Sequence, residues 1–139
     1  MATIAPRWST RPAAPGVLLA TASLLLALGG ASHLAAYHKA VAAVQASNLA
    51  PYFGNTLKGL WLMDSSGMFV LSLVCAIVAV RPGTASRSVV LLLSLIPLST
   101  ALLLYVFIGP FIGAHLLLAT AGAILRAGSM REFQDRVDP

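Results

Sequence analysis

Four apolar stretches dominate this 139-residue chain and constrain what it can fold into. A helix needs about 20 apolar residues to cross the roughly 30 Å hydrocarbon core of a bilayer, and each stretch is about that long. With 58% hydrophobic and only 9% charged residues, a soluble domain of this size could not bury so much apolar surface. The sequence therefore predicts an integral membrane protein with spans at 17–37, 57–80, 89–108 and 111–126.

We expect these spans to be helices because every backbone polar group inside lipid needs a partner within the protein. The alternation typical of membrane barrel strands is absent from them. Short, turn-rich connections at 81–87 and at Gly109-Pro110 predict antiparallel neighbours, the second and third helices among them. The fold class is thus all-α integral membrane, a four-transmembrane-helix antiparallel bundle that forms one domain over residues 1–139.

Basic residues are distributed unevenly between the two sides of this topology. One side carries only Lys39 and Lys58, whereas the other carries Arg7, Arg11, Arg81, Arg87, Arg126, Arg131 and Arg136. Cytoplasmic loops are enriched in Lys and Arg, so we expect both termini in the cytoplasm and a multi-pass protein of the cell membrane. The net charge of +5 then reflects orientation, and no nucleic-acid partner is expected.

The first span admits a second interpretation. A positive start, an apolar run and the small residues Gly29 to Ser32 also resemble a secretory signal peptide with its cleavage region. Because the apolar run continues through Tyr37, we expect the segment to be retained, with processing left as the alternative.

Three local features predict details of the helices. Residues 40–47 could extend the first helix beyond the membrane, and Asn55 or Thr56 could cap the second. Pro97 should kink the third helix near its middle, because it removes one backbone hydrogen bond.

A carboxylate inside the second span is the strongest indication of a function. Asp64 is the only acidic residue before Glu132, and a charge near the bilayer centre costs several kcal/mol. His33, Asp64 and His115, from three helices, are expected at similar depth in the outer half of the bundle. Tyr37, Trp61 and Ser65 are secondary candidates beside them.

Helical spacing predicts which faces point inward. The expected inward stripes are Ser23, Ala27, Gly30, His33 and Tyr37 on the first helix, Trp61, Asp64/Ser65, Met68, Ser72 and Cys75 on the second, and His115, Ala119 and Gly122 on the fourth.

Three hypotheses fit this polar cluster. His33, His115 and Asp64 could bind a transition metal, haem or another small ligand, although the cofactor is not identified by the residues. The cluster could handle protons or small solutes in an oligomer. Alternatively, Asp64 is a structural lock in an accessory subunit that contacts other membrane subunits or itself as well as the lipid bilayer.

Enzymatic chemistry has little support in this sequence. It contains no Gly-x-Ser-x-Gly elbow, no phosphate-binding loop and no pair of acids in the spans. Because no catalytic motif is present, whether the protein is an enzyme stays open.

Overall fold

The computed structural model describes residues 14–130, which are mainly helical and contain no strand. The elements in chain order are α1 (Ala14–Ala35), α2 (Tyr37–Gln45), α3 (Pro51–Val80), the short 3₁₀ helix η1 (Pro82–Thr84), α4 (Arg87–Leu93), α5 (Leu95–Phe107) and α6 (Ile112–Ser129). Within this range, four helical segments are long and apolar enough to cross a membrane: Ala14–Gln45, Pro51–Val80, Arg87–Phe107 and Ile112–Ser129. The predicted all-helical class is confirmed.

The first two segments are longer than the predicted spans. The helical path of α1 continues through α2 to Gln45, as expected for the first helix. The predicted cap of the next helix at Asn55 or Thr56 is wrong, because α3 already begins at Pro51. Proline suits the first helical position, where its missing N–H would have no partner anyway. Packing of α2 on α3 buries Gly54 beside Val44 and so stabilises these extra turns.

The third segment is interrupted at Ser94, between α4 and α5. Pro97 has no N–H to donate to the carbonyl oxygen of Leu93, and its ring would collide with that carbonyl group in a regular helix. The Ser94 hydroxyl donates to the Leu91 carbonyl oxygen at 2.6 Å. The helix interruption that Pro97 predicts is therefore present, and it lies at Ser94, about one turn before the proline.

The turn between α5 and α6 depends on a glycine. Gly109 has a φ of +92°, a left-handed conformation that costs little only without a Cβ. Pro110 follows directly, and α6 begins two residues later at Ile112. The predicted Gly109-Pro110 turn is confirmed.

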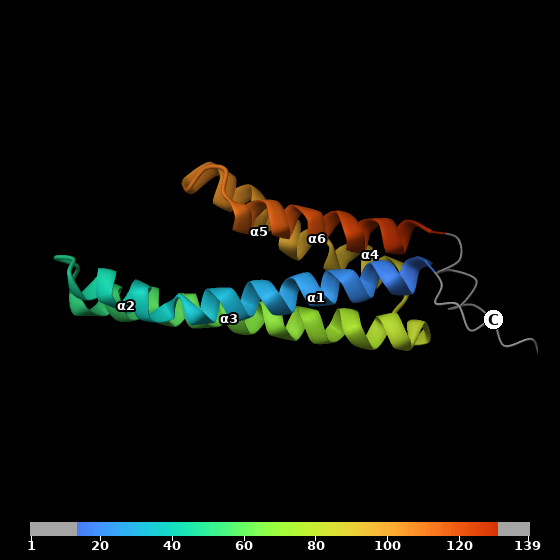
Figure 1. The fold of residues 1–139 in the computed structure, drawn as a ribbon, viewed down its shortest axis with the longest axis horizontal. Helices are drawn as coiled ribbons and strands as arrows, with labels where there is room; N and C mark the ends of the chain where they lie inside the picture. Colours follow the sequence, from blue (N-terminus) through green and yellow to red (C-terminus); the bar gives the residue numbers. More distant parts are fainter. Residues whose placement is uncertain (1–13, 131–139) are drawn as a thin grey trace, which may run out of the picture.

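The helices form two hairpins that meet through α1 and α6. α1 packs most extensively on α3 and also contacts α6, whereas α4 and α5 pack on α6. We call the end where the first and last described residues lie the termini end, and the opposite end the hairpin end. In Figure 1 the α5–α6 turn diverges from α1 and α3 toward the hairpin end.

This arrangement corrects one expectation from the sequence. Although only a short segment joins α3 to α4, neither α4 nor α5 packs extensively on α3. Small residues lie instead where α4 and α5 pack on α6, because such residues let two backbones approach closely. Gly128 of α6 lies against Leu91 and Val90 of α4, and Ala101, Ala114 and Ala121 are buried at α5 and α6.

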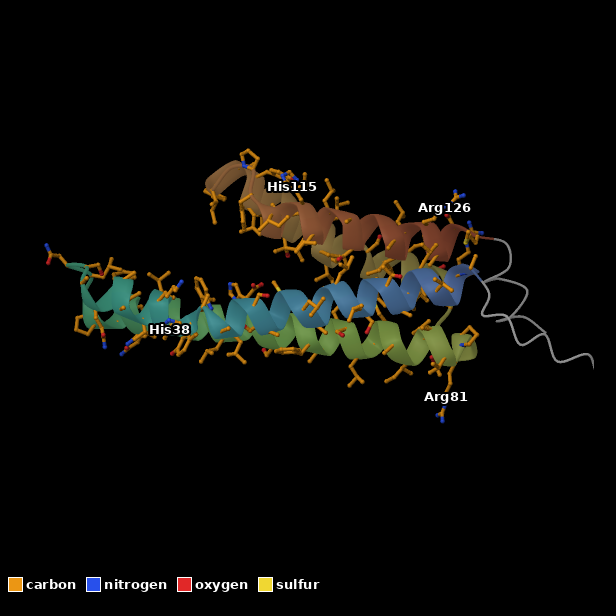
Figure 2. The ribbon with its side chains drawn as sticks, in the orientation of Figure 1. His38, Arg81, His115 and Arg126 are labelled. Atoms are coloured by element: carbon orange, nitrogen blue, oxygen red, sulfur yellow. The ribbon has the colours of Figure 1, made fainter. Side chains whose placement is uncertain are left out.

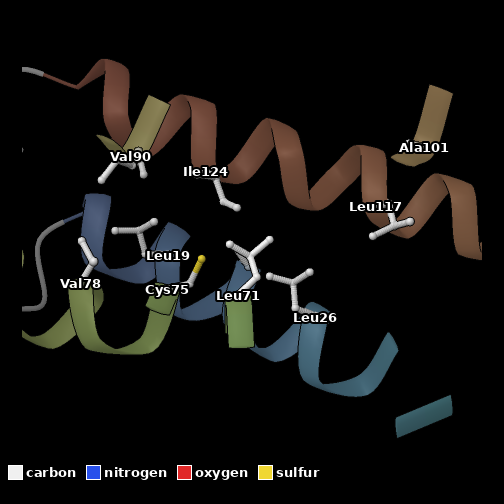
Figure 3. Close-up of a cluster of buried hydrophobic side chains, with 11 residues drawn as sticks. Leu19, Leu26, Leu71, Cys75, Val78, Val90, Ala101, Leu117 and Ile124 are labelled. Carbon is white, nitrogen blue, oxygen red and sulfur yellow. The ribbon is translucent and has the colours of Figure 1, made fainter. Parts of the chain in front are cut away.

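A single buried cluster joins the two hairpins. Leu19 and Leu26 from α1, Leu71 and Cys75 from α3, and Ile124 from α6 are among its members (Figure 3). The cluster lies mainly in the half of the molecule nearer the termini end. Toward the hairpin end, the side of α3 that faces α5 therefore has no tightly packed neighbour.

The α1–α3 contact is close at Gly30. A Cβ placed there would lie 3.2 Å from the Met68 Cβ and 3.3 Å from both the Phe69 ring and the Ser65 carbonyl oxygen. Farther along the interface, the Ser72 hydroxyl donates to the Ser23 carbonyl oxygen at 2.8 Å. The predicted stripes are therefore confirmed in part: Gly30, Ser65 and Ser72 lie buried at this contact, whereas the other buried residues of α1 include Leu19, Ala22 and Leu26, which the predicted stripe left out.

We expect Gly30→Ala to lower the free energy of unfolding relative to Gly29→Ala by about 1 kcal/mol, a cost typical of overpacking. The two glycines are adjacent in α1, so both changes alter helix propensity equally, but a Cβ at Gly29 meets only the Met68 sulfur at 3.6 Å. Thermal unfolding followed by circular dichroism in detergent measures the difference. Equal stability of the two variants would contradict a tight contact at Gly30.

Candidate functional site

His33 and Trp61 form the centre of a polar cluster between α1 and α3. Their rings stack with centroids 4.1 Å apart and planes 10° from parallel. The Trp61 indole Nε1 donates to the His33 carbonyl oxygen at 2.8 Å. This position lies one turn beyond the close contact at Gly30.

Both ring nitrogens of His33 face polar side chains of α3. Nδ1 lies 2.8 Å from the Ser65 hydroxyl oxygen, and Nε2 lies 3.7 Å from Asp64 Oδ2. The Ser65 hydroxyl also lies within hydrogen-bonding distance of the Trp61 carbonyl oxygen, at 3.1 Å. The His33 ring thus lies between Ser65 and Asp64 of α3.

Asp64 also lines a groove of about 710 Å³ beside α3. Most of the lining comes from α3, facing Leu93 of α4 and Ile96 and Thr100 of α5. The walls are mainly apolar, and Asp64 is the one charged side chain among the described residues that line them. The Asp64 side chain is 43% exposed, so His33 does not cover it completely.

His115 lies elsewhere. Its side chain is exposed, and Nδ1 is hydrogen-bonded to the Tyr105 hydroxyl group across the α5–α6 turn. Figure 2 shows His115 on the second hairpin, directed away from α1 and α3. The structure thus brings His33 and Asp64 together, with Trp61 and Ser65, but leaves His115 out of the cluster.

The inward stripe predicted for the last helix is also wrong. His115, Ala119 and Gly122 are exposed, whereas Ala114, Leu117, Ala121 and Ile124 are buried. α6 has small residues on two faces, and hydropathy cannot separate a protein-facing side from a lipid-facing one. The packing of α6 on α1, α4 and α5 makes that choice.

Donors for a metal ion do not gather in the described part of the chain. No group of three or more His, Cys, Asp or Glu side chains within residues 14–130 is placed to hold one. The metal and haem hypotheses therefore gain no support from this arrangement. Tyr37, the remaining secondary candidate, is partly buried at the start of α2, one turn beyond His33.

Sequence analysis missed Tyr105 and the groove residue Thr100. Tyr105 could have been found, because it and His115 lie at nearly equal distances on either side of the Gly109-Pro110 turn and so meet across an antiparallel hairpin. Thr100 gave no comparable signal, since its place on the groove depends on how the two hairpins diverge.

Comparison with protein-family models, curated proteins and solved structures finds no match for this chain.

We expect Ser65→Ala to destabilise the protein by about 1–2 kcal/mol, because it removes a buried partner of His33. Ser66→Ala is the matched control: its neighbouring hydroxyl donates only to the Met63 carbonyl oxygen of its own helix and is exposed. Chemical or thermal unfolding in detergent compares the two. If Ser66→Ala costs as much as Ser65→Ala, the hydrogen bond to His33 does not stabilise the α1–α3 contact.

Proposed function

We propose that this chain is a multi-pass protein of the cell membrane that binds a small amphipathic ligand in the groove between α3 and α5. The observation that carries the proposal is the position of Asp64, a carboxylate on the wall of an otherwise largely apolar groove. A carboxylate at membrane depth costs several kcal/mol, so its presence there calls for a partner.

The size and lining of the groove support a ligand of modest size. Its volume of about 710 Å³ falls within the roughly 300–1,000 Å³ typical of small-molecule sites, which combine apolar walls with a few polar groups. Here the apolar walls would accept a hydrophobic body, and Asp64 would fix one polar end of it.

The exposure of Asp64 favours a binding role over a purely structural one. Polar groups that only join α1 to α3 are largely shielded by both helices: Ser72 is 8% exposed where it bonds to Ser23. Asp64 contacts His33 on one side and reaches the groove on the other. In the proposed function, His33 holds the carboxylate in position and the ligand occupies its open side.

Charge distribution supports the proposed orientation in the membrane. Arg81 and Arg126 lie at the termini end, whereas His38 lies toward the opposite end (Figure 2). The Arg87 side chain donates to the Gly128 carbonyl oxygen at 3.1 Å at the termini end as well. By the positive-inside tendency we propose that the termini end lies in the cytoplasm and that the Asp64 part of the groove lies in the outer leaflet.

The absence of extensive packing between α3 and α5 favours a second candidate function. A transmembrane helix of another subunit could cover this seam, and the chain would then be an accessory subunit of a membrane complex. The two functions differ in what the groove holds when the protein is extracted in mild detergent, a small molecule or a second protein.

Gly67→Trp tests the groove directly. Gly67 lines it, and a Cβ there meets no atom within 4 Å, so an indole can enter the groove without a clash near the backbone. Gly59→Trp is the matched control, because Gly59 lies on the same helix in equally open space but does not line the groove. Native mass spectrometry of the purified full-length chain measures small-molecule adducts.

We expect the wild type and Gly59→Trp to carry an adduct that Gly67→Trp has lost, because only Gly67→Trp fills the groove. Equal adducts on both variants would refute binding there. Loss of a co-purifying protein from Gly67→Trp alone would favour the accessory-subunit function instead.

A further inference from the structure

We infer that the ligand of this groove is a long-chain amphipath with an ammonium head, lying lengthwise with its head at Asp64 and its chain toward Val74 and Leu93. The inference rests on the proposed function and specifies the chemistry of the ligand. It follows from the direction of the groove, the polarity of its two halves and the kind of hydrogen-bonding groups that it offers.

The groove runs along the helices. On α3 its lining extends from Leu60 to Val74, which at 1.5 Å per residue corresponds to about 20 Å. The hydrocarbon core of a bilayer is about 30 Å thick, so the lining covers more than the depth of one leaflet. A flexible alkyl chain parallel to the lipid chains matches this shape better than a compact molecule does.

Polar and apolar lining residues separate along the groove. α3 and α4 are joined at the termini end, where Val74 lies six residues before Val80 and Leu93 six residues after Arg87. These two apolar side chains therefore line the groove at similar depth. Asp64 and Thr100 lie farther along α3 and α5, toward the hairpin end. The polar lining residues thus lie in the half of the groove toward the hairpin end, with Leu60 beyond them, whereas the half toward the termini end is apolar.

The polar groups of the groove are poised to accept hydrogen bonds. The Thr100 hydroxyl donates to the Ile96 carbonyl oxygen at 3.0 Å, and the Ser66 hydroxyl donates to the Met63 carbonyl oxygen at 2.8 Å. Because these hydrogens are engaged within their own helices, lone pairs remain for a ligand. Asp64 as a carboxylate also only accepts. An ammonium group, with donors and no acceptor, complements this set.

Charge leads to the same conclusion. Asp64 is the one charged residue among the described lining residues, so the groove attracts cations and repels anionic heads such as sulfate. The attraction is stronger beside apolar walls than in water, because the local dielectric constant is lower. Met63 and Met68 on the walls suit chains of varied shape, since methionine side chains adapt easily.

The test measures binding of single-chain probes to the full-length protein in a neutral detergent by native mass spectrometry. The probes are dodecylammonium, hexylammonium, dodecyl sulfate and dodecanol, which vary chain length and head charge separately. Lysophosphatidylethanolamine is added to distinguish a membrane lipid from a simple amine. The proteins are the wild type, Asp64→Asn, the groove-filling Gly67→Trp and its control Gly59→Trp.

We expect the wild type and Gly59→Trp to bind dodecylammonium about tenfold more tightly than dodecanol, dodecyl sulfate or hexylammonium. Asp64→Asn should lose the preference for a cationic head and keep the preference for a long chain. Tighter binding of the lysolipid than of dodecylammonium would assign the ammonium head to a membrane lipid, and the reverse order to a free amine.

Two results would overturn the inference in distinguishable ways. If the probes bind the wild type but not Gly67→Trp, and head charge or chain length makes no difference, the groove binds ligands but the ammonium amphipath is wrong. If no probe binds the wild type more tightly than it binds Gly67→Trp, and purified wild type carries no adduct, the proposed function fails as well.

Discussion

The close contact between α1 and α3 is the constraint on which the rest of this structure depends. At Gly30 the α1 backbone lies against Met68, Phe69 and Ser65, and a side chain at this position would force these neighbours to shift. This approach lets His33 stack on Trp61 one turn later and puts Ser65 and Asp64 within reach of its two ring nitrogens. A wider separation of the helices would leave the same residues present but apart.

The groove is a consequence of where the packing is concentrated. α1 and α6 join the two hairpins through a buried cluster in the half nearer the termini end, and the third segment is interrupted at Ser94 between α4 and α5. Because α5 packs on α6 and not extensively on α3, a cavity with apolar walls remains between them. The Asp64 carboxylate, which lies 3.7 Å from His33 Nε2, lines this cavity.

Sequence reasoning succeeded where a local rule was sufficient. Four segments long enough to span a membrane, the glycine turn at Gly109 and the disruption before Pro97 each follow from hydropathy or backbone chemistry within a few residues. Part of the α1–α3 contact could also be predicted, because Ser23, Gly30 and Ser72 lie on stripes of small residues at helical spacing. His33 and Asp64 were candidates because they are ionisable residues of two spans that were expected at similar depth.

The amino-acid sequence by itself determined the helices, their turns and the presence of a carboxylate among apolar residues, because these properties depend on side-chain chemistry and short-range backbone geometry. Tertiary structure alone decided that His115 lies apart from Asp64, and that α3 faces α5 across a groove. Such choices depend on which helix faces approach one another. In helices apolar on nearly every side, small differences in packing settle that choice, and hydropathy does not record them.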